Sequence, residues 1–453
     1  MTAGSSTFDG DHPLTLSGDP VTDTRFHRPL AAHRPLATHR FRARLRSRAL
    51  TGAAAAAAIT LVVPLGASAQ SEIPDLGGIP GSTGAPASTS DSLGSLAPAT
   101  PLEPGPEVVV EPVLDGLTIP WDVVRDPGGV VVTGERDSGA VHAVHPDGTT
   151  SAVEADFSAL FTESESGLTG MALASDFDTS REVYTCHSSA DEQDNRVTSW
   201  TAAEDWSSLD SPEVLVDDIP LNDGGQHSGC RILAHPDGSL YIGTGDAFTG
   251  PAPQDLDSLG GKILHVTRDG EPADDTIGDS LVLTYGHRNV QGLDLQPDTG
   301  RVFSAEHGPS IDDEVNLVIP AGNYGWDPDA GGRYNQNVPM TDTAALPDAV
   351  EASWSSGAPT LAPAGIAFLD DPSWGEWNGA LAVAMLKTQQ IVLMMPSEDG
   401  RSVTRTATVI PGEHGRLRSL TAEPGGTLLA TTSNGGGDDE VLRISPAGAA
   451  PRE

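Results

Sequence analysis

The feature of this sequence that most constrains its fold is a pattern that recurs about six times between residues 108 and 446. Each copy joins a short β-branched run to a turn built on Pro, Asp and Gly, and further β runs follow. Alternating runs broken by such turns are typical of β-hairpins, because the turn residues tolerate the required dihedral angles. Six copies with a period of about 50–70 residues predict an all-β fold, a six-bladed β-propeller of four-stranded antiparallel blades.

The repeats also predict where each blade begins and how the ring closes. The copies start at Trp121, Gly167, Arg231, Gln291, Gly365 and Arg418. We expect a strand at residues 108–112 to complete the last blade. Two or three β-sandwich domains are the alternative, which the regular repetition disfavours.

The region before the repeats predicts export rather than folded structure. Residues 1–69 combine a basic segment, an uncharged apolar stretch and a closing Ala67-Ser68-Ala69, and they are expected to form an N-terminal signal. Residues 70–106 are a disordered linker rich in Pro, Gly and Ser, 107–447 the propeller, and 448–453 a tail. The expected location is secreted or extracytoplasmic, with no stable membrane insertion after cleavage. The minority alternative is an uncleaved signal that anchors the protein in the membrane.

Composition excludes several classes of function. The formal net charge is −39, which argues against a nucleic-acid partner, because such a partner needs a cationic face. The sequence lacks the HExxH, GxSxG and GxGxxG patterns of zinc hydrolases, serine hydrolases and nicotinamide enzymes. The two cysteines, Cys186 and Cys230, are expected to form a disulfide that braces a nearby histidine turn, since an even pair in an exported protein usually bonds.

Four cations at expected strand ends are unusual in so acidic a chain. They are Arg288, Lys387, Arg416 and Arg418, and Lys387 is one of only two lysines, the other being Lys262. If Arg416 and Arg418 lie on one strand, their side chains point to the same face, because they are two residues apart. The cations either bind a small polyanionic ligand or each pair with an aspartate.

Two further segments contain candidate chemistry. His227 lies in a glycine-rich turn, and Asp246 ends the following hairpin, where a carboxylate could orient the histidine. On spacing alone, a structural histidine is the competing interpretation. The acid-dense segment Glu306–Asn316 offers the oxygen ligands that Ca²⁺ prefers, or is a solvated loop.

Taken together, these motifs resemble the soluble pyrroloquinoline quinone (PQQ)-dependent sugar dehydrogenases of the glucose/sorbosone dehydrogenase family. The resemblance spans roughly residues 116–446 and includes eight ordered motifs. They are Pro120–Trp121, Gly167–Met171, His227–Arg231 with Gly245–Asp246, Gly260–Ile263, Gly286–Gly292, Glu306–Asn316, Asn323–Trp326 and Gly415–Arg418. One departure is Cys230, which stands where the family often has glycine in the motif His-x-Gly-Gly-Arg.

The resemblance implies a role for each candidate residue. His227 would be the general base and Asp246 would hold it, with Arg288 counted among both the catalytic and the cofactor-binding residues. The carbonyls of Gly308 and Pro309 would ligate Ca²⁺. The implied PQQ-binding residues are Arg288, Asn289, Lys387, Arg416 and Arg418.

The implied enzyme is a PQQ- and Ca²⁺-dependent aldose sugar dehydrogenase, an oxidoreductase acting on CH–OH donors. It would oxidise a sugar at the anomeric carbon to the lactone and pass electrons to an external quinone or cytochrome. A non-catalytic secreted propeller that only binds ligands is the alternative. A calcium-dependent lactonase is a third interpretation, which explains neither Lys387 nor Arg416 and Arg418.

Overall fold

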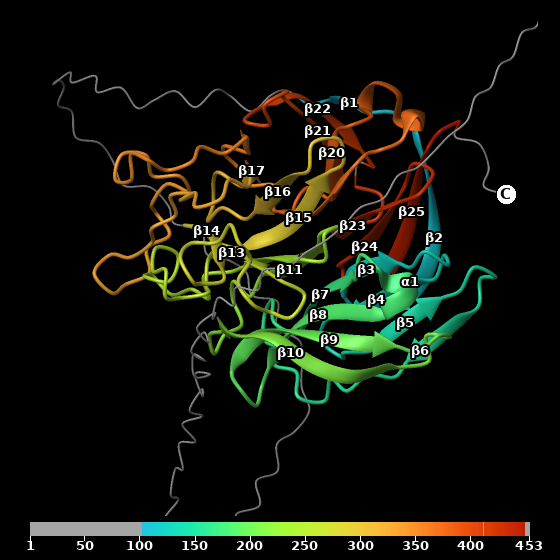
Figure 1. The fold of residues 1–453 in the computed structure, drawn as a ribbon. Coiled ribbons are helices and arrows are strands. Elements are labelled where there is room, and N and C mark those ends of the chain that lie inside the picture. Colours follow the sequence, from blue (N-terminus) through green and yellow to red (C-terminus); the bar gives the residue numbers. More distant parts are fainter. Residues whose placement is uncertain (1–101, 411, 449–453) are drawn as a thin grey trace, which may run out of the picture. The chain divides into compact units, whose positions relative to one another are not determined.

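The computed structural model describes residues 102–410 and 412–448, which fold almost entirely into β-strands. They form six antiparallel four-stranded sheets, one of which gains a short fifth strand, and the predicted six-bladed propeller is confirmed (Figure 1). Blade 1 contains β3 (Pro120–Arg125), β4 (Val131–Glu135), β5 (Val141–Val144) and β6 (Thr150–Val153). Blade 2 contains β7 (Leu168–Leu173), β8 (Glu182–Ser189), β9 (Asp194–Ala202) and β10 (Leu209–Pro220).

The remaining four blades follow in chain order. Blade 3 contains β11 (Cys230–Ala234), β12 (Leu240–Thr244), β13 (Lys262–Val266) and β14 (Val282–Tyr285). Blade 4 contains β15 (Val290–Gln296), β16 (Arg301–Glu306), β17 (Glu314–Leu317) and β18 (Trp354–Ser355). Blade 5 contains β19 (Pro363–Phe368), β20 (Leu381–Met385), β21 (Gln390–Pro396) and β22 (Val403–Val409). Blade 6 contains β23 (Leu417–Glu423), β24 (Thr427–Thr432), β25 (Asp439–Pro446) and β2 (Val108–Leu117).

The first strand of each blade lines the centre of the ring. Each inner strand contacts the next one around the ring, in the order β3, β7, β11, β15, β19 and β23, and β23 contacts β3 again. Only short helices occur in the described residues, α1 (Phe177–Ser180) and a 3-10 turn over Pro372–Trp377. Because the six inner strands occupy equivalent positions, their N-terminal ends all open on the same end of the channel.

The ring is closed by a strand from the start of the propeller. β2 pairs antiparallel with β25, placing Val108 opposite Pro446. In Figure 1 the cyan β2 lies beside the red β25. The expected closing strand is thus confirmed, and it extends to Leu117.

The hydrophobic core is divided between the blades. Six buried apolar clusters occur, and each joins the facing sides of two neighbouring blades around the ring. Tyr184 of blade 2, for example, packs in one cluster with Ile232 of blade 3. Successive side chains of a strand point to opposite faces and so supply both interfaces of a blade, which explains why β3, β13 and β20 are buried along almost their whole length.

A short strand precedes the closing strand. β1 (Glu103–Pro104) pairs parallel with β22 and adds a fifth strand to blade 5. The signal at 1–69 and most of the linker at 70–106 lie outside the described residues, so the predicted domain boundaries stay predictions. Among the described residues, no helix has both the length and the apolar composition needed to span a membrane.

Candidate active site

The predicted site residues lie where inner strands begin at one end of the channel. His227 precedes β11 by three residues, and Arg288 precedes β15 by two. Arg418 is the second residue of β23, while Lys387 follows β20, whose end lies beside the start of β19. Separate blades can therefore direct side chains to one shared space, although the residues are far apart in sequence.

His227 and Asp246 form a buried hydrogen-bonded pair. The Nδ1 atom of His227 lies 2.7 Å from Oδ1 of Asp246, and the two residues are 6% and 0% exposed. An ionised carboxylate only accepts hydrogen bonds, so Nδ1 carries the proton and Nε2 keeps its lone pair. Nε2 has no hydrogen-bond partner among the described residues, which leaves it free to accept a proton from a ligand.

The turn that holds His227 is conformationally constrained. His227 has a φ of 51°, in the left-handed region that non-glycine residues seldom adopt. Its carbonyl packs against Gly245, where an added Cβ would approach the His227 oxygen to 2.0 Å. A side chain at position 245 would therefore displace the histidine, which explains the glycine directly before Asp246.

Two aromatic residues hold the other side of Asp246. The Tyr334 hydroxyl donates to Oδ2 at 2.6 Å, and the indole Nε1 of Trp326 donates to the same atom at 2.8 Å. The ring of Phe248 stacks on Tyr334 at 4.2 Å and contacts the His227 ring at 4.7 Å. Sequence reasoning quoted Trp326 without a role and missed Tyr334, which lies in the long segment between β17 and β18, where no repeat pattern marks it.

The four cations have no carboxylate partners. In residues 102–410 and 412–448, no ion pair within 4.0 Å involves Arg288, Lys387, Arg416 or Arg418. Eight other arginines of the same region do pair with carboxylates: Arg125, Arg136, Arg181, Arg196, Arg231, Arg268, Arg405 and Arg443. Of the two interpretations of these cations, pairing with aspartates is therefore wrong in the described part of the chain, and binding of a polyanionic ligand stays a prediction.

Arg418 is the most deeply buried of these cations. Its guanidinium stacks over the Trp121 ring, with Cζ 3.8 Å from the ring centroid, and donates to Gln291 at 3.1 Å. Its Nε is buried without a partner. Burial lowers the pKa of Arg418 to about 9, and the neighbouring Arg416, Arg231 and Arg136 act in the same direction. An arrangement that concentrates positive charge in this way is favourable once an anion binds.

The other cations are more accessible. Lys387 is exposed, and its Nζ donates to Thr360 at 2.9 Å. Arg416 is also exposed and lies just before β23. The prediction that one strand directs Arg416 and Arg418 to the same face is therefore wrong, because only Arg418 belongs to the strand. Within the described part of the chain, the Arg416 side chain makes no hydrogen bond.

Arg288 and Asn289 connect the cations to the histidine turn. The backbone oxygen of Arg288 accepts from Asp246 N at 2.9 Å, and its guanidinium donates to the His307 carbonyl at 2.9 Å. Asn289 accepts from Gly229 N at 3.1 Å and donates to Glu165 at 2.8 Å. Glu165 is a further site residue that sequence reasoning missed, since a lone acid in a loop carries no pattern.

The acidic segment after β16 uses its carboxylates for internal hydrogen bonds. Asp313 accepts from the backbone N–H groups of Gly308, Leu361 and Ala362, and Glu306 accepts from His287 and from Arg288 N. The described residues contain no group of three or more His, Cys, Asp or Glu able to hold a metal. The carbonyls of Gly308 and Pro309 accept no hydrogen bond from the described residues, so they remain candidate calcium ligands.

The predicted disulfide and the buried Lys262 are both structural features of blade 3. The predicted disulfide between Cys186 and Cys230 is present and joins β8 of blade 2 to β11 of blade 3. Lys262 is fully buried, and its Nζ donates to the carbonyls of Ala252, Pro253 and Gly260. Lys262 is therefore a structural contact within blade 3, and it is not available to a ligand.

The fold and the site together define a class of protein: a six-bladed propeller with a buried histidine–aspartate pair and cations without carboxylate partners at one end of its channel. The family model described as Glucose / Sorbosone dehydrogenase matches residues 117–443. The chain therefore belongs to the Glucose / Sorbosone dehydrogenase family.

Known proteins are similar over most of the chain. The aldose sugar dehydrogenase YliI of Escherichia coli is 27% identical, over 77% of this chain and 94% of its own length. The PQQ-bound aldose sugar dehydrogenase of Streptomyces coelicolor is 30% identical, with a TM-score of 0.62, over 76% of this chain and 99% of that one. A glucose dehydrogenase-type oxidoreductase of Thermus thermophilus is 35% identical, with a TM-score of 0.63, over 75% of this chain and all of that one.

Proposed function

We propose that this protein oxidises an aldose at the anomeric carbon to the lactone, with PQQ and Ca²⁺ as cofactors. The observation that carries the proposal is the buried His227–Asp246 pair at the end of the channel where four cations without carboxylate partners also lie, with Arg288 in direct backbone contact with Asp246. PQQ carries three carboxylates, which such cations match. The PQQ-bound relative from Streptomyces coelicolor supports the same assignment.

The chain's own contribution to the reaction is proton transfer and positioning. A sugar bound beside His227 would place its anomeric hydroxyl on the free Nε2, which takes the proton. Asp246 keeps Nδ1 protonated and stabilises the imidazolium that forms. Loss of that proton and of a hydride from the anomeric carbon leaves the lactone.

Five residues would hold the cofactor: Arg288, Asn289, Lys387, Arg416 and Arg418. The unpartnered Nε atoms of Arg288 and Arg418 and the free donors of Lys387 and Arg416 suit a ligand with several carboxylates. When bound, PQQ supplies a two-electron acceptor, and Ca²⁺ polarises its reacting carbonyl. Gly308 and Pro309 would contribute carbonyl oxygens, the type of ligand that Ca²⁺ prefers.

Reconstitution tests the proposal directly. The chain from Gln70 onward, supplied with PQQ and Ca²⁺, should reduce an artificial dye in the presence of aldoses, and the activity should need both additives. His227→Ala should abolish turnover while PQQ still binds, because only the proton acceptor is lost. Unchanged turnover in His227→Ala would remove this residue from the mechanism. Absence of PQQ binding in the intact chain would favour the non-catalytic binding propeller.

The cations can be tested separately from the base. Arg416→Ala should weaken PQQ binding by about 1.5–3 kcal/mol, the range for a hydrogen bond to a charged group. Arg416 suits this test because its exposed side chain makes no hydrogen bond within the described residues, so its loss should leave the fold intact. Arg405→Ala is the matched control, because Arg405 pairs with Glu103 and Glu376 on the surface. Equal PQQ affinity in the two variants would contradict the assignment of Arg416.

The electron acceptor and the location belong to the same proposal. The lactone-forming reaction releases two electrons, so an external quinone or cytochrome is needed to restore the cofactor. The signal predicted at residues 1–69 supports a secreted or extracytoplasmic enzyme. A sugar substrate is consistent with the names of the relatives.

A further inference from the structure

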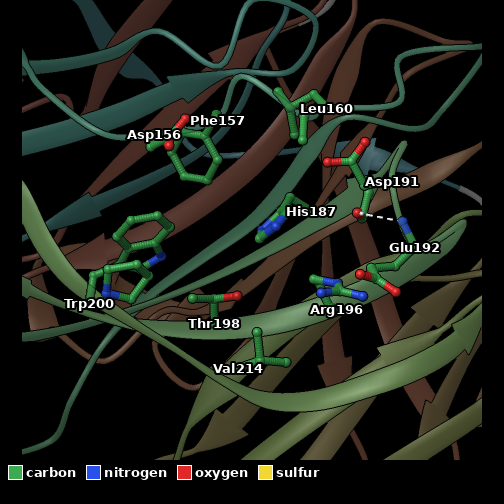
Figure 2. Close-up of a pocket in the computed structure, with 13 residues that line it drawn as sticks. Asp156, Phe157, Leu160, His187, Asp191, Glu192, Arg196, Thr198, Trp200 and Val214 are labelled. Carbon is green, nitrogen blue, oxygen red and sulfur yellow. Dashed lines mark hydrogen bonds between the residues drawn. The ribbon is translucent and has the colours of Figure 1, made fainter. Parts of the chain in front are cut away.

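Blade 2 contains a cavity that is separate from the His227 site. It lies between the outer strands β8, β9 and β10 and the segment of residues 156–160, and has a volume of about 270 Å³ (Figure 2). That segment is fixed in place, because Ala190 N bonds to the Ala159 carbonyl and Phe161 N to the Ser188 carbonyl. Pockets for drug-sized ligands span about 300–1,000 Å³, so this cavity suits a single small ring.

The walls of the cavity are aromatic and aliphatic. Phe157 and Trp200 meet with ring centroids 5.2 Å apart and tilted by 55°, and Leu160 and Val214 complete the apolar lining. The indole N–H of Trp200 is already bonded to Thr185 at 2.8 Å, so the cavity meets only the apolar surface of the indole. Such walls favour a ligand with an apolar C–H face.

Two buried polar atoms that line the cavity lack hydrogen-bond partners. They are the hydroxyl of Thr198, a residue only 2% exposed, and Nδ1 of His187. Figure 2 shows His187 between Phe157 and Thr198. Burial lowers the pKa of His187 to about 4, and the Arg196 charge adds to the effect, so the ring is neutral at physiological pH. A buried polar group without a hydrogen bond is unfavourable, and a ligand hydroxyl would supply the missing bond.

The charges around the cavity disfavour an anionic ligand. Asp156, Asp191 and Glu192 at the rim would repel an anion. Arg196 donates through Nε and Nη2 to Asp194, so its guanidinium is already paired and offers no binding group to an anion. A hydroxyl both donates and accepts, which matches Thr198 and a neutral histidine better than an anion does.

We propose that this cavity is a non-catalytic binding site for a neutral hydroxylated ring, a pyranose sugar. The ring's C–H face would pack on Trp200 and Phe157, and its hydroxyls would bond to Thr198 and His187. The site is independent of the proposed oxidation, because no residue of the His227–Asp246 pair or the cation cluster lines it.

Methyl pyranosides are the appropriate probes, because they lack the free anomeric hydroxyl that the proposed oxidation requires. Saturation-transfer NMR on the full chain with methyl glucoside, galactoside and mannoside should show saturable binding of at least one. Val214→Trp should weaken that binding at least about tenfold by filling the cavity from its open side. Val109→Trp is the matched control, since both valines are exposed on outer strands, at 46% and 49%.

A second variant tests the unpartnered hydroxyl. Thr198→Val keeps the shape of the side chain and removes no hydrogen bond within the protein, so the fold should be retained, as thermal unfolding will verify. It should weaken sugar binding about five- to tenfold, the effect of one hydrogen bond. Binding that is equal in wild type, Val214→Trp and Thr198→Val, or the absence of saturable binding of every probe, would overturn the proposal.

Discussion

Asp246 is the residue on which the geometry of the candidate active site depends, because four donors converge on its carboxylate. His227 and Phe248 N bond to Oδ1, and Trp326 and Tyr334 bond to Oδ2. A carboxylate that accepts this many hydrogen bonds is held in one rotamer. The orientation of the histidine ring therefore depends on residues from three different segments.

Tyr334 is expected to act as a positioning residue. Tyr334→Phe removes the hydroxyl bonded to Asp246, and kcat should fall about tenfold to a hundredfold, with a smaller change in KM. The pH profile of kcat should also shift, because the carboxylate loses a donor and interacts more strongly with the imidazolium. Tyr241→Phe, a stacked tyrosine of β12, is the control and should leave kcat unchanged. Equal kcat in the two variants would remove Tyr334 from this role.

Among the residues of the candidate active site, the sequence predicts those that lie beside the strands of the repeats and misses those in segments without a repeat pattern. His227, Asp246, Arg288 and Arg418 were identifiable because each lies within a few residues of a strand that the repeat pattern marks. Tyr334 and Glu165 were not, because their segments have no period. Their contribution depends on how loops from different blades meet, which only tertiary structure determines.

At the scale of a single strand, β15 contains an aspartate, Asp294, whose pKa is raised. Asp294 accepts from Phe368 N of the neighbouring blade at 2.6 Å, and burial raises its pKa from 3.8 to about 7. The folded protein therefore binds more protons than the unfolded chain between about pH 4 and 7. The contribution of Asp294 to the free energy of unfolding therefore falls as the pH rises through that window.

Asp294→Asn should remove this pH dependence. The amide oxygen can still accept from Phe368 N, and no charge is desolvated above pH 7, so the variant should be more stable than wild type at pH 7.5. At pH 5 the two should differ less, as chemical denaturation at both values will show. Asp298→Asn, an exposed acid at the end of the same strand, is the control. A parallel pH dependence in wild type and Asp294→Asn would contradict the assignment.

The strands themselves were largely predictable, because hairpin turns and alternating apolar residues repeat in every blade. Each inner strand begins within two residues of the expected start of a repeat. Two details were not predictable. β1 pairs with β22 over only two residues, with an ion pair between Glu103 and Arg405, and β2 continues five residues beyond the expected Pro112 because it follows the length of β25. Neither depends on a side-chain pattern.

At the scale of the whole propeller, the weakest point is the place where the ring closes. Blade 6 receives β2 from the start of the propeller, whereas the four main strands of every other blade come from one continuous stretch of chain. Without β2, the edge of β25 and the apolar surface around Val441 and Leu442 would be exposed.

Truncation tests this closure. A chain starting at residue 118 lacks β2, so it should unfold at a markedly lower temperature and tend to associate through the open edge of β25. A chain starting at residue 107 is the control, because it loses only β1 and keeps the ring closed. Differential scanning calorimetry compares the two. The same unfolding temperature in both would show that β2 contributes little to stability.

The pairing of Val108 with Pro446 has a consequence for how the gene could be rearranged. Opposite residues of an antiparallel ladder lie about 5 Å apart, so a linker of a few residues could join the two ends of the propeller. New ends could then be opened at the turn between any two blades, giving circular permutants with the same contacts in a different chain order. The starting point of the chain is thus a property of the gene rather than of the ring.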